Sequence, residues 1–286
     1  MNFVYSIANY GWHFETDYPL IDNEESAKFK ISEDEVAADW VCKAKKVDRL
    51  PAPAGILVKE TKEQRIYVDG TFVWVELLSR ECDEAWFLCK YSLEEAKESS
   101  LWILDEKRPY TARIEHLWSA VNFPAQLLSK DILMLHSAVI EKNGKAILFI
   151  APTCTGKSTQ AKLWEKFRGA KQLNGDKAGV RIADGIVKAC GLPFCGTSGI
   201  CEVYDLPVEA LVILSQAKEN QVERLSGMKA LLTVSKNCYG HTEIPGCSEK
   251  IFRLVTEVLE KVPVYSLACT PDERAVNALE KCLREE

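Results

Sequence analysis

The chain has 286 residues and a formal net charge of −6 at pH 7, with 47% hydrophobic and 27% charged residues. These values are ordinary for a globular protein of one large or two modest domains, and they exclude wholesale disorder. The acidic balance and the absence of a block rich in lysine and arginine argue against a nucleic-acid partner.

The sequence begins without a basic, apolar leader at Met1, and it contains no apolar run of membrane-spanning length. We therefore expect a cytoplasmic protein with no membrane partner. The 11 cysteines form no CxxC pairs, and most should be reduced in that compartment. Two clusters of possible metal ligands are Cys190, Cys195 and Cys201, and Cys238, His241 and Cys247. Neither has four ligands at the spacing of a structural zinc site, so we interpret these side chains as buried or incidental.

The part of the chain before residue 130 is rich in aromatic residues and contains six of the seven tryptophans. Short alternating segments there predict an antiparallel sheet with hairpins, and Asp69-Gly70 predicts one of the turns. These segments are ILVKE, RIYVD and TFVWVELL. Residues 111–128 have the apolar spacing of a helix, which Pro124 should end or kink.

After residue 130 the pattern changes to strands that alternate with helices. Asn143-Gly144 and Asp184-Gly185 each predict a hairpin, and a helix should follow residue 156. A later helix begins at a predicted Ser226 cap, and Pro271 is expected in the first turn of the last helix. The sequence therefore predicts a mixed α/β protein, with a smaller β-rich α+β domain over residues 1–129 and a second domain over residues 130–286.

The segment APTCTGKS at residues 151–158 fits the pattern A/G-x-x-x-x-G-K-S/T, between an apolar strand and a helix. Small residues allow successive backbone N–H groups to converge on phosphate oxygens, and the helix directs its positive end at the same anion. The lysine reaches the outer phosphates and the final hydroxyl can bind Mg²⁺. The predicted phosphate-binding residues are Thr153, Cys154, Thr155, Gly156, Lys157, Ser158 and Thr159. The alternative is an ordinary strand–turn–helix with a surface lysine.

Three other side chains are candidates for the same site. His136 lies on the strand that the Asn143-Gly144 hairpin places beside the strand feeding the loop. Asp176 follows a short strand, where P-loop proteins place a metal ligand or general base. Arg224 could stabilise phosphate charge. The alternatives are a core histidine, a turn aspartate and a solvated surface arginine.

Four segments in chain order resemble the HPr kinase-like family of P-loop kinases, which share the phosphoenolpyruvate carboxykinase-like fold. They are LHSAVIEKNGKAILFIAPTCTGKSTQAKLW, LNGDK, GLPFCGT and AKENQVERLS. The resemblance extends from about residue 130 to the C-terminus. The aromatic first half more weakly resembles the N-terminal module of standalone members, and such a module would shape access of the acceptor.

The resemblance implies a kinase that uses ATP and Mg²⁺ to phosphorylate a hydroxyl, usually of serine, on a protein or peptide. Some relatives use other phosphate donors or small acceptors. Small standalone members occur with peptide-modifying gene clusters, so a ribosomally made peptide is a candidate acceptor. The resemblance also favours a homo-oligomer.

Residue by residue, His136 matches the family's histidine near the phosphates. Lys157 and Ser158 match the P-loop lysine and the metal-binding hydroxyl. Asp176 matches the second of two consecutive aspartates that serve metal binding and proton transfer. The resemblance thus implies His136, Lys157 and Asp176 as catalytic residues, and Ser158 and Asp176 as metal ligands.

The sequence departs from the family pattern at several positions. Gly175 replaces the first aspartate, and Ala151 and Cys154 replace P-loop glycines. Glu202 lies where a second metal carboxylate could follow, but its flanking residues do not match. The segment that docks HPr in the bacterial enzyme is not recognisable.

These departures leave three hypotheses. The first is a kinase that transfers the γ-phosphate of ATP to a serine hydroxyl of a protein or peptide. The second is a nucleotide-binding pseudokinase or regulatory subunit, which would bind ATP without transfer. The third is a kinase of a small hydroxylated metabolite such as free serine, which would act without a macromolecule.

Overall fold

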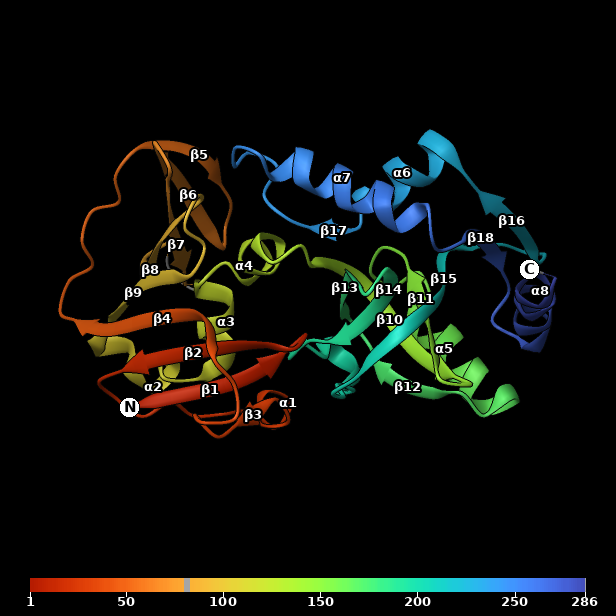
Figure 1. Cartoon of the computed structure of the whole chain (residues 1–286), viewed down its shortest axis with the longest axis horizontal. Helices are drawn as coiled ribbons and strands as arrows, with labels where there is room; N and C mark the ends of the chain where they lie inside the picture. Colours follow the sequence, from red (N-terminus) through yellow and green to blue (C-terminus); the bar gives the residue numbers. More distant parts are fainter. Residues whose placement is uncertain (80–82, 286) are drawn as a thin grey trace. The chain divides into compact units, whose positions relative to one another are not determined.

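The structure is a computed structural model of the chain and describes residues 1–79 and 83–285. The chain forms two compact units (Figure 1). Unit 1 comprises residues 1–130 and 241–248, and unit 2 comprises residues 131–240 and 249–286. The sequence-based division did not foresee that residues 241–248 belong with the first part of the chain.

The described strands of unit 1 form a sheet in the order β3-β1-β2-β4-β9-β8-β7-β6-β5. Their bounds are β1 Asn2–Ile7, β2 Tyr10–Thr16, β3 Lys30–Ile31, β4 Ala38–Val47, β5 Ile56–Glu60, β6 Gln64–Asp69, β7 Phe72–Leu78, β8 Ala85–Ser92 and β9 Glu98–Leu104. The three predicted strands are confirmed as β5, β6 and β7, and the predicted turn at Asp69-Gly70 joins β6 to β7.

This sheet is mixed, whereas the sequence predicted an antiparallel one. Strand β4 is parallel to both of its neighbours, β2 and β9. Parallel neighbours require a crossover connection, and long segments separate β2 from β4 and β4 from β9. Alternation of apolar and polar residues is the same in parallel and antiparallel strands, so it could not reveal these pairings.

The helices of unit 1 are short. They are α1 Glu24–Ala27, α2 Arg108–Thr111, α3 Ile114–Ala120 and α4 Phe123–Ser129, with a 3-10 turn η1 at Asp105–Lys107. The expected interruption by Pro124 is confirmed, because the helix stops at Ala120 and restarts at Phe123. Asn122 between them has a φ of 53°, and Pro124 lies in the first turn of α4.

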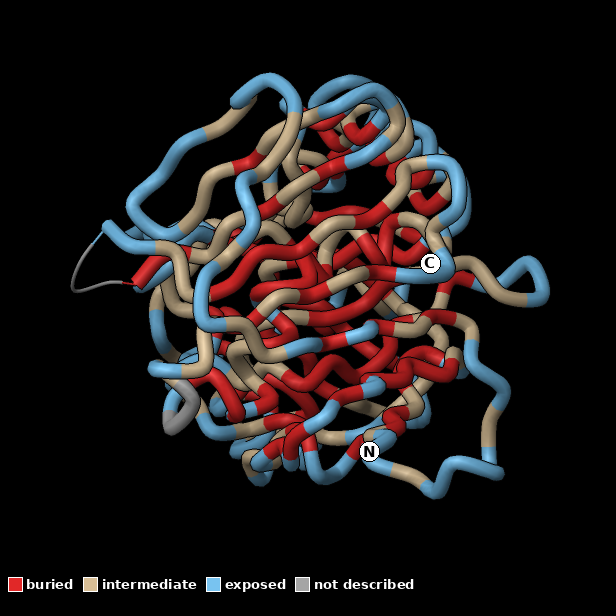
Figure 2. The backbone as a smooth tube through the Cα atoms, turned by 90° about the vertical axis from the view of Figure 1, so that its left-hand side faces the viewer, coloured by how far each residue is buried: buried red, intermediate tan, exposed pale blue. Residues whose placement is uncertain are grey.

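Aromatic rings fill the core of unit 1. The ring of Trp12 lies 4.9 Å from that of Phe123, and Phe14 lies 4.9 Å from Trp118, each pair edge to face. Such pairs add about 0.5–1.5 kcal/mol beyond the burial of their area. This core explains why the first half of the chain is so rich in aromatic residues. Figure 2 shows buried positions concentrated in the inner segments of the chain and exposed positions along its outer segments.

Unit 2 is also built on a mixed sheet, with the main strand order β11-β10-β13-β14-β15-β18-β16. The strand bounds are β10 Leu133–Lys142, β11 Lys145–Ile150, β12 Lys171–Asn174, β13 Lys177–Ala183, β14 Ile186–Gly191, β15 Asp205–Gln216, β16 Gln221–Leu225, β17 Cys238–Tyr239 and β18 Val264–Cys269. Both predicted hairpins are confirmed, as β10–β11 and β13–β14. The fold of the chain is mixed α/β, as predicted.

Two long strands of unit 2 change partners along their length. Residues Leu133–His136 of β10 pair with β13, and residues Ser137–Lys142 pair with β11. Strand β15 pairs with β14 through Asp205–Pro207 and with β11 beyond that point. His136 is thus the last residue of β10 before the strand changes partner.

The helices of unit 2 are α5 Lys157–Arg168, α6 Gly227–Ser235, α7 Cys247–Leu259 and α8 Glu273–Arg284, with a 3-10 turn η2 at Gly196–Ser198. The first two residues of α7 belong to unit 1. Helix α5 packs on β10, β11 and β12 and against α8. Ser226 occupies the N-cap position of α6, as expected, but its side chain makes no capping hydrogen bond. The prediction for Pro271 is wrong, because Asp272 caps α8 with its side chain and leaves Pro271 outside the helix. In the described part of the chain, every helix is too short or too polar to cross a lipid bilayer.

Candidate active site

The predicted phosphate loop connects the end of β11 at Ile150 to the start of α5 at Lys157. Gly156 precedes the helix with a φ of 117°, a conformation that only glycine adopts readily. The first N–H groups of α5 have no acceptor within the helix, and they point toward the loop with the positive end of the helix dipole. Ser158 and Thr159 are exposed in this first turn. An anion at this position would be favoured by these N–H groups and by the helix dipole.

Cys154 occupies a left-handed conformation with a φ of 63° and exposes its side chain. That conformation costs a residue other than glycine about 1–2 kcal/mol. The amide of Gln216, at the end of β15, donates to the Cys154 carbonyl over 3.3 Å. The loop thus holds its turn without the glycine usual there, and a neighbouring strand supports it.

Lys157 is only 8% exposed, although it carries an ammonium group. Its Nζ donates to the Ala151 carbonyl over 2.8 Å and lies 3.1 Å from Nε2 of His136. Burial lowers the pKa of Lys157 below that of a free lysine. The side chain is therefore held across the loop rather than extended into solvent.

His136 lies on β10, where its N–H donates to the Asn237 carbonyl over 3.0 Å. Its ring makes an edge contact with Tyr239, with centroids 6.0 Å apart. Burial and the charge of Lys157 lower the pKa of His136, so the ring is neutral near pH 7. Nε2 therefore faces both the Lys157 ammonium and the Asp176 carboxylate.

Asp176 follows β12, and its carboxylate lies 3.4 Å from His136 Nε2. The buried Asn174 fixes this turn, because its Oδ1 accepts from the N–H groups of Asp176 at 2.8 Å and Lys177 at 2.9 Å. The N–H of Ser137 donates to the Asp176 carbonyl over 2.9 Å. Residues from three separate segments therefore meet at one place, as the candidate roles of His136, Lys157 and Asp176 require.

Lys177 is a member of the cluster that the sequence analysis missed. Its ammonium pairs with the Asp176 carboxylate and lies 5.3 Å from each of the rings of Phe194 and Tyr239. It also stands directly opposite His136 in the β10–β13 ladder. That pairing could have been inferred from the two strands only if their register had been known. With neutral His136, two ammonium groups face one carboxylate, so the cluster is one positive charge in excess.

Gly175 lies against the turn η2. A Cβ at this position would overlap the hydroxyl of Ser198, which donates to the Cys195 carbonyl over 2.6 Å. The same turn brings Gly196 against Asp176, because a Cβ on Gly196 would lie 2.8 Å from the Asp176 Cβ. An aspartate side chain therefore has no space at position 175, and Gly196 of the segment GLPFCGT lies against Asp176.

Two other candidate residues also belong to unit 2. Arg224 is on β16, the last strand in the sheet order, opposite Tyr265 of β18. Glu202 lies between η2 and β15, where its N–H donates to the Leu173 carbonyl over 2.9 Å. Among residues 1–79 and 83–285, no group of three or more His, Cys, Asp and Glu side chains is arranged to hold a metal ion.

No family model matches the chain, and no curated protein matches it. Among solved structures, the chain is similar to the HPr(Ser) kinase/phosphatase from Coxiella burnetii, with a TM-score of 0.31 and 10% sequence identity. The similarity covers 53% of this chain and 88% of that one.

Proposed function

We propose that this protein is a kinase that uses ATP and Mg²⁺ to phosphorylate a hydroxyl, with a serine of a protein or peptide as the acceptor. The observation that carries the proposal is the meeting of Lys157, His136 and Asp176 at a helix N-terminus. A lysine, a phosphate-binding turn and a carboxylate base are the parts that phosphoryl transfer requires. A ribosomally made peptide is one acceptor of this class.

In this reaction the acceptor oxygen attacks the γ-phosphorus, and the bond from that phosphorus to the β–γ bridging oxygen breaks. ADP leaves, and Asp176 accepts the proton of the acceptor hydroxyl. Lys157 and the amides of residues 153–159 bind the β- and γ-phosphates, while His136 holds Lys157 in place. Positioning and electrostatic stabilisation supply most of the rate.

The donor set suits Mg²⁺, which prefers hard oxygen ligands. Ser158 offers an exposed hydroxyl and Asp176 a carboxylate that is 20% exposed. These two residues would hold the ion. When bound, Mg²⁺ neutralises charge on the β- and γ-phosphates.

A second candidate function is a nucleotide-binding pseudokinase or regulatory subunit. It is favoured by the ion pair of Asp176 with Lys177 and by the Ser198 side chain that fills the space beside Gly175. In the active kinase, the Lys177 ammonium exchanges its carboxylate partner for a phosphate oxygen. In a pseudokinase, the Asp176–Lys177 pair persists with nucleotide bound.

The test is transfer from γ-labelled ATP with Mg²⁺ in an extract of the parent cell separated by size, with Asp176→Asn as the control. We expect label on a protein or peptide that requires the unmodified Asp176. Label only on a small molecule would instead indicate a metabolite kinase, for example of free serine. ATP binding without any transfer of label would contradict the kinase and favour the pseudokinase.

A further inference from the structure

The turn η2 at Gly196–Ser198 carries two hydroxyl side chains next to the proposed base. A Cβ on Gly196 would lie 2.8 Å from the Cβ of Asp176 and 3.3 Å from its Oδ1. Oδ1 is also the carboxylate oxygen that lies 3.4 Å from Nε2 of His136. This oxygen is therefore close both to the cluster that would bind the phosphates and to the backbone of η2.

The acceptor hydroxyl of the proposed reaction must approach the same oxygen. Asp176 removes the proton of the acceptor while the acceptor oxygen attacks the γ-phosphorus, and the reacting atoms need to be about 3–3.5 Å apart. The other carboxylate oxygen, Oδ2, pairs with Lys177. An acceptor that uses Oδ1 thus lies next to η2, and this turn itself contains two candidate acceptors.

The two hydroxyl groups of the turn differ in availability. The Oγ of Ser198 donates to the Cys195 carbonyl over 2.6 Å and accepts from the Ile200 N–H over 3.1 Å. These bonds hold the serine oxygen within the turn. Thr197 is exposed, and within the described residues its hydroxyl has no hydrogen-bond partner. The Thr197 oxygen is therefore available as a nucleophile, whereas the Ser198 oxygen is engaged.

Thr197 is close enough to the base for transfer within one molecule. Consecutive Cα atoms are about 3.8 Å apart, so the Thr197 Cα lies within about 9 Å of Asp176 Oδ1. Gly196 and Gly199 bracket the turn with φ values of 58° and 68°, and glycine changes its backbone conformation at little steric cost. A rotation of the turn at these two residues can therefore carry the Thr197 hydroxyl toward the carboxylate and the phosphate.

We propose that the protein phosphorylates its own Thr197 in an intramolecular reaction. The Thr197 oxygen attacks the γ-phosphorus of bound ATP, the bond from that phosphorus to the β–γ bridging oxygen breaks, and ADP leaves. The proton of the Thr197 hydroxyl goes to Asp176. The inference rests on the proposed kinase function and adds a modification site, which is distinct from the serine of the external acceptor.

The test incubates the purified full chain with γ-labelled ATP and Mg²⁺, without any added acceptor. We expect a single phosphoryl group on the chain, located at Thr197 by mass spectrometry of proteolytic peptides. Because the acceptor is held next to the base, the first-order rate constant of labelling should not depend on protein concentration. A rate constant that rises with protein concentration would show transfer between molecules and would overturn the intramolecular reaction.

Variants separate Thr197 from the other hydroxyl groups of the chain. Thr197→Val keeps the shape of the side chain but removes the nucleophile, so labelling should be lost, whereas Thr197→Ser should retain it. Asp176→Asn should slow labelling at least about 100-fold, because it removes the base. Thr256→Val is the matched control and should be labelled like the unmodified chain, since Thr256 is an exposed threonine on α7.

The possible failures of this inference and of the proposed function are distinguishable. Undiminished labelling of Thr197→Val, or phosphate on a different residue, would contradict the assignment of Thr197. Equal labelling of Asp176→Asn would assign the reaction to a contaminating enzyme and would contradict it too. An unlabelled chain that still transfers phosphate to a protein or peptide of the cell extract would overturn this inference alone. A chain that binds ATP but transfers label neither to itself nor to any acceptor would overturn both proposals.

Discussion

Asp176 accepts the proton in the proposed reaction. Asparagine is the residue closest to it in shape that cannot act as a base. Asp176→Asn removes the base but keeps the backbone contacts with Asn174 and Ser137. General-base assistance is typically worth about 10²–10⁴-fold, so transfer should fall at least 100-fold. Affinity for ATP should stay within a few-fold. Single-turnover kinetics and equilibrium binding measure the two effects, and unchanged transfer would remove Asp176 from the mechanism.

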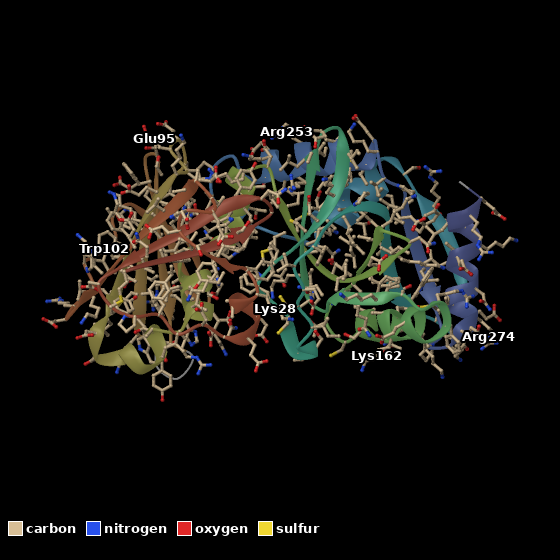
Figure 3. All side chains as sticks on the ribbon, turned by 60° about the horizontal axis from the view of Figure 1, so that its bottom comes forward. Lys28, Glu95, Trp102, Lys162, Arg253 and Arg274 are labelled. Atoms are coloured by element: carbon tan, nitrogen blue, oxygen red, sulfur yellow. The ribbon has the colours of Figure 1, made fainter. Side chains whose placement is uncertain are left out.

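Lys177 should matter for nucleotide affinity. Lys177→Met removes one of the two ammonium groups of the cluster and should weaken ATP binding by about tenfold, within the usual contribution of a charge-assisted hydrogen bond. Lys162→Met is the matched control. Lys162 is exposed on α5, and its label in Figure 3 marks its place on this helix. Equal affinities of the two variants would show that Lys177 serves only the ion pair with Asp176.

Cys154 should store conformational strain. Cys154→Gly is expected to stabilise unit 2 by about 1 kcal/mol relative to Cys154→Ala, because glycine adopts a positive φ without steric cost. Thermal unfolding of the two variants measures the difference. If alanine is as stable as glycine here, the loop does not keep its left-handed turn in solution.

At the scale of single residues, the sequence predicted part of the candidate site. The P-loop pattern and the family resemblance indicated Lys157, His136 and Asp176, which the structure brings together. Lys177 and Asn174 were not foreseen. Their roles depend on strand register and on a buried side-chain amide, and neither feature has a local sequence signal.

The turn η2 packs against the end of β12, and Gly175 lies where the two segments are in closest contact. Gly175→Ala should destabilise unit 2 by about 1–3 kcal/mol, because the added methyl overlaps the Ser198 hydroxyl. The double variant with Ser198→Gly should recover most of that loss. Urea unfolding of the two single variants and the double variant gives the coupling energy. Simple additivity would contradict the packing described here.

Hairpins and helices were predictable at the scale of elements, whereas sheet order was not. Asn143-Gly144 and Asp184-Gly185 fix their turns locally, and Pro124 separates α3 from α4. The parallel pairing of β4 and the change of partner along β10 depend on contacts far apart in the sequence. A periodic pattern identifies the buried face of a strand but not its neighbour.

At the scale of the whole molecule, the two units should lose stability in different ranges of pH. In unit 1, burial lowers the pKa of His241 to about 4. The unfolded chain therefore takes up a proton first, and this histidine's contribution to stability is lost as pH falls from about 6.5 to 4. In unit 2, Lys142 and Arg168 help hold the pKa of Glu280 at about 2. The contribution of Glu280 to stability is lost at lower pH, between about pH 4.5 and 2.

Denaturation by urea at several pH values tests this difference. Six of the seven tryptophans lie in unit 1, so their fluorescence follows that unit. The fluorescence midpoint should fall between pH 6.5 and 4, and His241→Gln should flatten that fall. Glu280→Gln should leave it unchanged, because its partners belong to unit 2. A midpoint equally dependent on pH in His241→Gln would show that other groups control the acid stability of unit 1.

The assignment of residues 241–248 to unit 1 also has a consequence for how the chain matures on the ribosome. Glu243 pairs with Lys59 of β5, and His241 contacts Gln64 of β6. The sheet of unit 1 therefore gains these contacts only late in synthesis. At about 5–20 residues per second, the wait after residue 130 emerges is on the order of ten seconds. During that time the exit tunnel releases most of unit 2. Unit 1 is therefore translated first, but it cannot be completed until most of unit 2 has been made.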